Sequence, residues 1–327
     1  MKKQIHYFDI SSGWKIALTR YLPEKATGQH PVLLVHGLTT NHITFDLSPR
    51  YSLAQYLAGA GYDVWAIDLR GRGLSKKNPG GTTKNCSLDD YMDEELTGAQ
   101  NYIFEKTGSS QTHWIGHSMG GILLLSWLAR TAGDINTGIK SGIAVAASLN
   151  YGVSDSKFKK ALPLKWILPH LSSLSVAPVS TLLSPLAGRF DNAVERFYYW
   201  LSNMEPAAAR SLMADGFHAV PTGVLAQLIS AFEPGGLRQA KSNEFYLDTI
   251  SKVKVPIFLI AGDKDFQCPP RAVELVYDQI EEKDKKLTVF GKDSGASSHY
   301  GHFDLLVGKH AQQEVFPEIL NWLSSHD

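Results

Sequence analysis

The 327-residue sequence has few cysteines, no net charge and no long apolar run. Its two cysteines, Cys86 and Cys268, form no metal-ligand or C-x-x-C spacing, which is typical of a reducing compartment and leaves one disulfide open. Lysine plus arginine and aspartate plus glutamate number 32 each, so no basic field indicates a nucleic-acid partner. No apolar run approaches the roughly 18 residues of a membrane span. We therefore expect no nucleic-acid binding and no integral membrane segment.

The first residues also lack the features of a secretory signal. The positive start is not followed by an apolar stretch of about 7–15 residues and a small-residue cleavage site, which predicts a cytoplasmic protein. The hydrophobic content of 43% is enough for a sizeable core. The oligomeric state stays open.

Short apolar runs alternate with helical patterns along most of the chain. Strands are expected at 7–10, 14–21, 31–35, 62–67, 111–115, 139–147, 255–261 and 287–290, the first two as a hairpin. Helices are expected at 52–60, 87–106, 271–280 and 311–323. This alternation predicts an α/β fold with a mostly parallel, doubly wound sheet of about eight strands.

The alternation lapses for about a hundred residues in the middle of the chain. This segment is rich in proline, leucine, serine and aromatic residues and has helical patterns, for example at 191–201 and 224–232. A loop of that length without secondary structure is improbable in a compact domain. We expect a core domain from residues 1–149 and 250–327, with residues 150–249 inserted as a helical cap.

The most informative motif is at residues 116–121, which read Gly-His-Ser-Met-Gly-Gly between a strand-like and a helix-like run. In a strand–turn–helix context, glycines on both sides of a serine allow a sharp turn that exposes the hydroxyl. Ser118 is therefore the candidate nucleophile. His117, inside the turn, is interpreted as structural.

A serine hydroxyl needs a neighbouring base, usually histidine, which a carboxylate orients. Two carboxylates, Asp263 and Asp265, follow the strand at 255–261, and Asp155 is a further alternative. The loop before the last helix carries His299 and His302. His302 is the preferred base and His299 the reserve.

These motifs together resemble the α/β-hydrolase superfamily over nearly the full length of the chain. The resemblance rests on His-Gly-Leu at 36–38, Asp-Leu-Arg-Gly-Arg-Gly-Leu-Ser at 68–75, the turn at 116–121, Gly-Asp-Lys-Asp at 262–265 and Gly-His at 301–302. Within the superfamily the chain looks like acid lipases and esterases and, more loosely, polyhydroxyalkanoate synthases. Those synthases use a cysteine at the position of Ser118.

The resemblance implies roles for further residues. The family spacing favours Asp265 over Asp263 as the acid. The backbone N–H groups of Leu38 and Met119 would form the oxyanion hole, which stabilises negative charge on the substrate carbonyl oxygen.

Other site types have weaker support in the sequence. The loop at 70–73 lacks the Lys-Ser/Thr of a phosphate-binding loop and is interpreted as structural. The acidic residues Asp89, Asp90, Asp93, Glu94 and Glu95 invite a metal hypothesis, but are better explained as favouring the start of the long helix, with the remainder a solvated face. No grouping has zinc-like spacing. We expect neither a metal nor a cofactor.

The sequence thus predicts a serine hydrolase that cleaves carboxylic esters with an apolar acyl or alcohol part, through Ser118, His302 and Asp265 and an acyl-enzyme intermediate. Acyl transfer and hydrolysis of carbon–carbon or amide bonds remain as alternatives on the same residues. A non-catalytic receptor for a small apolar ligand is a further alternative from another class.

Overall fold

The computed structural model describes residues 1–27, 30–84, 86–134, 137–166, 171, 173–175 and 177–327. Its centre is one sheet with strand order β1-β2-β4-β3-β6-β7-β10-β11, to which the short β5 adds beside β2. Adjacent strands from β4 to β11 run parallel, whereas β2 is antiparallel to both β1 and β4. This confirms the predicted mostly parallel sheet of about eight strands.

The strands that carry the candidate site are buried on both faces. The strands of the sheet are β1 Lys2–Ile10, β2 Trp14–Leu22, β3 Val32–Val35, β4 Val64–Asp68, β5 Lys76–Lys77, β6 Thr112–His117, β7 Ile139–Val145, β10 Ile257–Gly262 and β11 Lys285–Phe290. Every residue of β3, β4, β6 and β10 is buried. Parallel strands covered on both faces read as continuous apolar runs, and for this reason the sequence identifies them.

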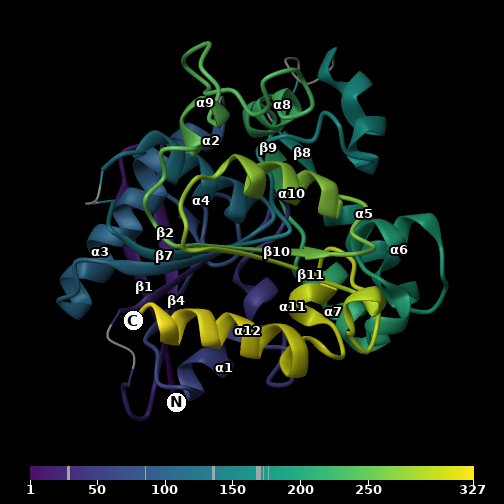
Figure 1. Ribbon diagram of the computed structural model, residues 1–327, viewed down its shortest axis with the longest axis horizontal. Coiled ribbons are helices and arrows are strands. Elements are labelled where there is room, and N and C mark those ends of the chain that lie inside the picture. The colour runs from purple at the N-terminus through teal and green to yellow at the C-terminus, as the bar shows by residue number, and fades with distance from the viewer. Residues whose placement is uncertain (28–29, 85, 135–136, 167–170, 172, 176) are drawn as a thin grey trace.

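The helices cover the two faces of the sheet. Figure 1 shows α1 (Leu53–Gly59) and α12 (Ala311–Ser325) against one face, and α4 (Met119–Arg130) and α10 (Pro270–Gln279) against the other. The predicted helices at 52–60, 271–280 and 311–323 are therefore present with small shifts of their ends. In β3, β6 and β7, Val35 pairs with Gly116, and His117 pairs with Val145. The carboxyl ends of these strands thus align at one edge of the sheet.

The long helix predicted at 87–106 is interrupted. Ser87 caps α2 (Leu88–Asp90) in a capping box with Asp90, a π-helical turn follows at Tyr91–Leu96, and α3 covers Thr97–Thr107. The capping box satisfies backbone N–H groups that a helix start leaves without partners. The expectation that acidic residues favour the helix start therefore holds for Asp90.

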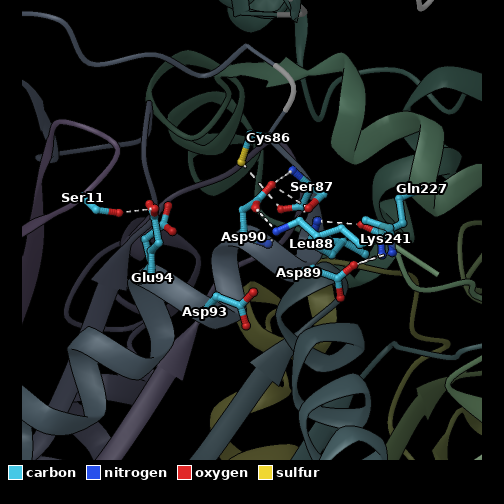
Figure 2. Close-up of polar contacts among 12 residues, drawn as sticks. Ser11, Cys86, Ser87, Leu88, Asp89, Asp90, Asp93, Glu94, Gln227 and Lys241 are labelled. Atoms are coloured by element: carbon cyan, nitrogen blue, oxygen red, sulfur yellow. Dashed lines mark hydrogen bonds and ion pairs between the residues drawn. The ribbon is translucent and has the colours of Figure 1, made fainter.

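The expected solvated face is wrong for Asp89 and Glu95, which are buried. Asp89 accepts hydrogen bonds from Tyr246 Oη, from the Ala240 backbone and, at 3.2 Å, from Gln227 Nε2. Figure 2 shows part of this cluster. The segment containing residues 227–246 folds over the helix start, a long-range contact that local charge patterning does not reveal.

Glu95 and its neighbour Glu94 bind a second buried partner, Arg70. The guanidinium of Arg70 lies 2.5 Å from Glu95 Oε1 and 2.6 Å from Glu94 Oε2. Glu94 also accepts a hydrogen bond from Ser11 Oγ, as Figure 2 shows. These carboxylates are ion-paired with Arg70 within the protein.

Several helices occupy the segment between β7 and β10. Its helices and strands are a 3₁₀ stretch at Lys157–Trp166, β8 Ser173–Ser175, α5 Ala177–Leu183, α6 Ala193–Tyr198, α7 Pro206–Asp215, β9 Ala219–Pro221, α8 Thr222–Ser230 and α9 Leu247–Ile250. The predicted helix at 191–201 is shorter than expected, and the one at 224–232 begins two residues earlier. Strands β8 and β9 pair with each other and not with the central sheet, while α5, α6 and α7 lie beyond one end of that sheet (Figure 1).

Two further expectations concern membranes and thiols. Over the residues that the structure describes, no helix combines the length and apolar character needed to cross a bilayer. Cys86 and Cys268 are buried free thiols, so the disulfide that the sequence left open does not join them.

Candidate active site

Ser118 lies on a strained turn between β6 and α4. Its backbone has φ 54° and ψ −119°, a conformation that residues with a side chain rarely adopt and that costs about 1–3 kcal/mol. The turn requires glycine on both sides: a Cβ on Gly116 would lie 2.2 Å from the Gly120 carbonyl oxygen, and one on Gly120 would lie 1.9 Å from that of Val35. The spacing of glycines around the serine thus has a steric cause.

His302 and Asp265, the preferred base and acid, are in contact. His302 Nδ1 lies 2.7 Å from Asp265 Oδ2, and both side chains are almost completely buried. The other oxygen, Asp265 Oδ1, accepts the backbone N–H groups of Gln267 and Cys268, each at 2.8 Å. These two bonds fix the carboxylate, so that Nδ1 of His302 donates to Oδ2 and Nε2 remains free to accept a proton.

The alternative residues form a separate pair. His299 Nδ1 lies 2.5 Å from Asp263 Oδ2, and Asp263 Oδ1 accepts the Tyr300 backbone N–H at 2.9 Å. Asp155 is exposed and makes no hydrogen bond to either histidine among the described residues. The two aspartates that directly follow β10 therefore each bind a histidine of the later loop. The two pairs differ in where the imidazole lies.

Only one of the two pairs faces Ser118. A cavity of about 230 Å³ is lined by Ser118 and His302 together with Leu38 and Met119, whereas neither His299 nor Asp263 lines it. No hydrogen bond joins the Ser118 hydroxyl to the His302 ring in the described part of the chain. Such contacts are often long in a free enzyme and tighten when substrate binds.

Most of the cavity wall is apolar. Its lining residues include Ile122, Tyr151, Phe158, Phe197, Tyr198, Val220, Leu225, Leu228, Ile229 and Phe232. All of these except Ile122 belong to the segment 150–249. Water finds few hydrogen-bond partners in such a space, and apolar groups enter it favourably.

The loop after β3 presents Leu38 to this cavity with a defined backbone orientation. His36 is fully buried, and burial lowers its pKa to about 3, so the ring is neutral. Its Nε2 accepts the Leu69 N–H at 3.2 Å, and its Nδ1 therefore donates to the Gly37 carbonyl at 2.8 Å. Since C=O and N–H point in opposite directions across a trans peptide, this bond also orients the Leu38 N–H.

The second candidate donor belongs to a helix start. Met119 is the first residue of α4, and the first N–H groups of a helix have no partner within it. The N–H of Leu38 likewise donates to no protein acceptor within the described residues. Both groups are available to a ligand in the cavity.

His117 and Asp304 bind the backbone next to the side chain of the candidate base, His302. His117 is buried and donates from Nε2 to the His302 carbonyl at 3.0 Å, while burial keeps its pKa well below the ordinary value. Asp304 is buried and accepts three hydrogen bonds, from Gly301 N, Trp200 N and Asn203 Nδ2. Sequence reasoning assigned His117 a structural place but gave no role to Asp304.

Asp304 predicts a pH dependence of stability. Burial raises its pKa from 3.8 to about 7, so between these values the folded protein binds a proton that the unfolded chain has released. The free energy of unfolding is therefore expected to fall as the pH rises from about 4 to 7, by up to about 4 kcal/mol. Urea unfolding of wild type and Asp304→Asn at pH 5 and pH 8 measures this.

The aspartate-to-asparagine variant should lose the part of this slope that Asp304 contributes, while Glu95, whose pKa burial also raises to about 7, should keep its own part. Asn203 Oδ1 has no partner within the described part of the chain, so its amide can turn to accept from the new Asn side chain while Trp200 and Gly301 keep their acceptor. An unchanged slope in Asp304→Asn would assign the pH dependence to other groups.

One cluster outside this site has side chains that metals use. His30, His113 and Asp327 have ligand atoms within 4.8 Å of one another, although they are distant in sequence. Asp327 Oδ1 accepts the His30 backbone N–H at 2.9 Å and lies 3.0 Å from His30 Nδ1. The cluster lies at the starts of β3 and β6, the edge opposite Ser118, and its hydrogen bonds connect the end of α12 to the sheet.

Comparison with known proteins identifies the family. The model of the α/β-hydrolase fold matches residues 30–308. The chain belongs to the α/β-hydrolase family. Human lipase member K is 26% identical over 343 aligned positions, which cover 94% of this chain and 82% of that protein. The predicted resemblance of this α/β-hydrolase to lipases and esterases is thereby confirmed.

Two other relatives of this α/β-hydrolase differ in what they cover. The poly(3-hydroxyalkanoate) polymerase subunit PhaC of Haloarcula marismortui is 21% identical over 98% of this chain, which spans only 65% of PhaC. The structure of a soluble variant of Saccharomyces cerevisiae monoglyceride lipase, in complex with a substrate analog, superposes with a TM-score of 0.69 at 16% identity, over 100% of this chain and 96% of that one. At that identity the likeness shows the fold alone.

Proposed function

We propose that this carboxylic ester hydrolase of the lipase and esterase type cleaves esters with an apolar acyl or alcohol part. Ser118 is the nucleophile, His302 the general base and acid, and Asp265 the residue that orients His302. The observation that carries the proposal is the shared cavity: Ser118, His302, Leu38 and Met119 line one apolar space, and the His302 ring is bound to Asp265.

The proposed reaction needs no cofactor. Ser118 Oγ attacks the ester carbonyl carbon while His302 Nε2 takes the hydroxyl proton. The Leu38 and Met119 N–H groups stabilise the negative oxygen that results, each worth about 3 kcal/mol of barrier. The intermediate collapses, His302 gives its proton to the leaving alcohol, and water releases the acyl group from Ser118 by the same steps.

We also propose that residues 150–249 act as a cap that determines substrate choice. Support comes from the composition of the cavity wall, because Phe158, Tyr198 and Phe232 from this segment face Ser118 and Leu38 from the core. The catalytic groups are shared by enzymes of many specificities, so selectivity must come from such variable walls.

The cavity size predicts the preferred chain length. At roughly 30 Å³ per water-sized group, a cavity of about 230 Å³ holds about eight such groups. The kcat/KM of nitrophenyl esters is therefore expected to rise from acetate to a maximum near hexanoate or octanoate and to fall for palmitate. A flat profile over this series would contradict the proposed apolar site.

A matched pair of variants tests whether this cavity sets the optimum. Leu225 and Ala226 are adjacent in α8, but only Leu225 lines the cavity, and Ala226 is exposed. Leu225→Trp should move the optimum to shorter esters, whereas Ala226→Trp should leave it unchanged.

Acyl transfer is a second candidate because PhaC, a polymerase subunit, is among the relatives. The same acyl-enzyme would then react with an alcohol in place of water. Product analysis in the presence of competing alcohols separates transfer from hydrolysis. Transfer requires that the ratio of ester product to free acid well exceed the ratio of alcohol to water in the solution.

A further inference from the structure

Arg72 is a buried arginine without a carboxylate partner. Its exposed fraction is 2%, and no acidic group of the described residues lies within ion-pair distance. Its guanidinium instead donates to backbone carbonyls, from Nη2 to Leu38 at 3.0 Å and from Nη1 to Ala219. A third, longer contact of 3.5 Å reaches the Gly71 carbonyl, and Nε has no partner among the residues that the structure describes.

Arg70, two residues earlier, provides the contrast. It is also buried, but it pairs with Glu94 and Glu95. Burial of a cation that no carboxylate pairs with costs several kcal/mol, and burial lowers the pKa of Arg72 although the more distant Glu95 opposes the shift. The Arg72 guanidinium stays buried despite this cost, and its N–H groups bind two backbone segments. We take this as a sign that the connection between the two segments is important.

The first of these segments is the loop that presents the candidate oxyanion donor. Two peptide groups flank Leu38, and both are held by their carbonyl oxygens. His36 binds the Gly37 carbonyl at 2.8 Å, and Arg72 binds that of Leu38 at 3.0 Å. Together these bonds leave the Leu38 N–H with one orientation.

The second segment is β9 and the residues before it, within the segment 150–249. Three separate connections reach it, one from Arg72 in the loop after β4 and two from the loop after β3. Arg72 reaches Ala219, the Thr39 carbonyl accepts the His218 N–H at 2.6 Å, and Asn41 Nδ2 donates to the Asp215 carbonyl at 3.1 Å. Arg72 is the member that joins β9 directly to the peptide of Leu38.

We propose that Arg72 is a positioning residue for the oxyanion hole. It keeps the Leu38 N–H oriented toward the carbonyl oxygen of a substrate bound at Ser118. Because Arg72 also binds β9, this orientation depends on the position of β9. The Leu38 donor is then correctly placed only while β9 is in contact with the loop. This inference rests on the proposed serine hydrolase activity.

The test compares Arg72→Met with Arg70→Met, which removes the neighbouring buried arginine. The readouts are kcat and KM for nitrophenyl butyrate, and the affinities of two ligands of similar size. The Ser118 hydroxyl adds to the carbonyl carbon of an aryl trifluoromethyl ketone, and the resulting hemiketal places a negative oxygen in the oxyanion hole. The corresponding alcohol fills only the apolar cavity.

Arg72→Met is expected to lower kcat by about 10²-fold, in the range seen when one oxyanion donor is lost, with KM changed by less than threefold. Affinity for the ketone should fall by a similar factor, and affinity for the alcohol should not. Arg70→Met should lower the urea concentration at the midpoint of unfolding, without a selective loss of affinity for the ketone over the alcohol. Arg72→Lys, which keeps a donor and the charge, should recover part of kcat and serves as the variant if Arg72→Met does not fold.

Two results would overturn the inference. One is a kcat of Arg72→Met and Arg72→Lys within threefold of wild type, and the other is an equal loss of affinity for ketone and alcohol. Wild-type turnover separates this from failure of the proposed function: if wild type neither hydrolyses the ester nor binds the ketone covalently, the serine hydrolase proposal itself is wrong.

Discussion

Replacing Ser118 with alanine is expected to reduce kcat for a chromogenic short acyl ester by about 10⁴-fold or more, since a lost nucleophile removes covalent catalysis entirely. The overall fold should be retained, because alanine is smaller than serine and the hydroxyl makes no hydrogen bond within the described residues. A fluorophosphonate probe, which reacts with activated serines, should label wild type and not the variant.

Ser126 gives the matched control for this experiment. It lies on the same helix, α4, and is buried, and its hydroxyl has no hydrogen-bond partner in the described ranges. Ser126→Ala should keep both turnover and labelling. If Ser118→Ala retained most of the activity, the nucleophile would be elsewhere; folded wild type that resists labelling would favour the receptor alternative.

Replacing His302 with glutamine is the second change with a very large expected effect, a loss of about 10⁴-fold or more in kcat. Glutamine fills similar space but cannot take and return a proton, so Ser118 would lose its base. The measurement is single-turnover ester cleavage, which isolates attack by Ser118 from product release. Labelling by the fluorophosphonate should slow in parallel.

His299→Gln is the corresponding control, because it breaks the similar pair with Asp263 outside the cavity. Its kcat is expected to stay within about threefold of wild type, with a small loss of stability. A large loss in His299→Gln with near-normal activity in His302→Gln would exchange the roles of the two histidines.

The sequence predicts the central sheet well because its signal is local. Strands such as β3 and β10 are buried on both faces and appear as short apolar runs, and the glycines around Ser118 mark a turn that no larger residue can make. Parallel strands bring their carboxyl ends to one edge, so the order of the motifs along the chain also predicts which side chains meet.

The choice between neighbouring residues of the same type was harder to predict. Asp263 and Asp265 are two residues apart, and each binds a histidine of the same later loop. Only the resemblance to a family favoured Asp265 in the sequence. The deciding property is which imidazole lines the cavity with Ser118, and this depends on the path of the loop in three dimensions.

Long-range contacts explain what the sequence missed. Glu95 is buried because Arg70 meets it from another loop, and charge patterning along the helix contains no sign of that partner. Arg72 is similar: its sequence neighbours suggested only a structural turn, while its hydrogen bonds join Leu38 to Ala219, almost two hundred residues apart.

The backbone of Ser118 has a consequence for how this protein evolves. A residue with φ 54° is held there by its surroundings against its own preference, at a cost that glycine would largely avoid. Selection for thermal resistance alone would therefore favour glycine at position 118, whereas selection for the proposed chemistry would keep serine. The position proposed for the nucleophile is thus also one where folding and activity have opposite requirements.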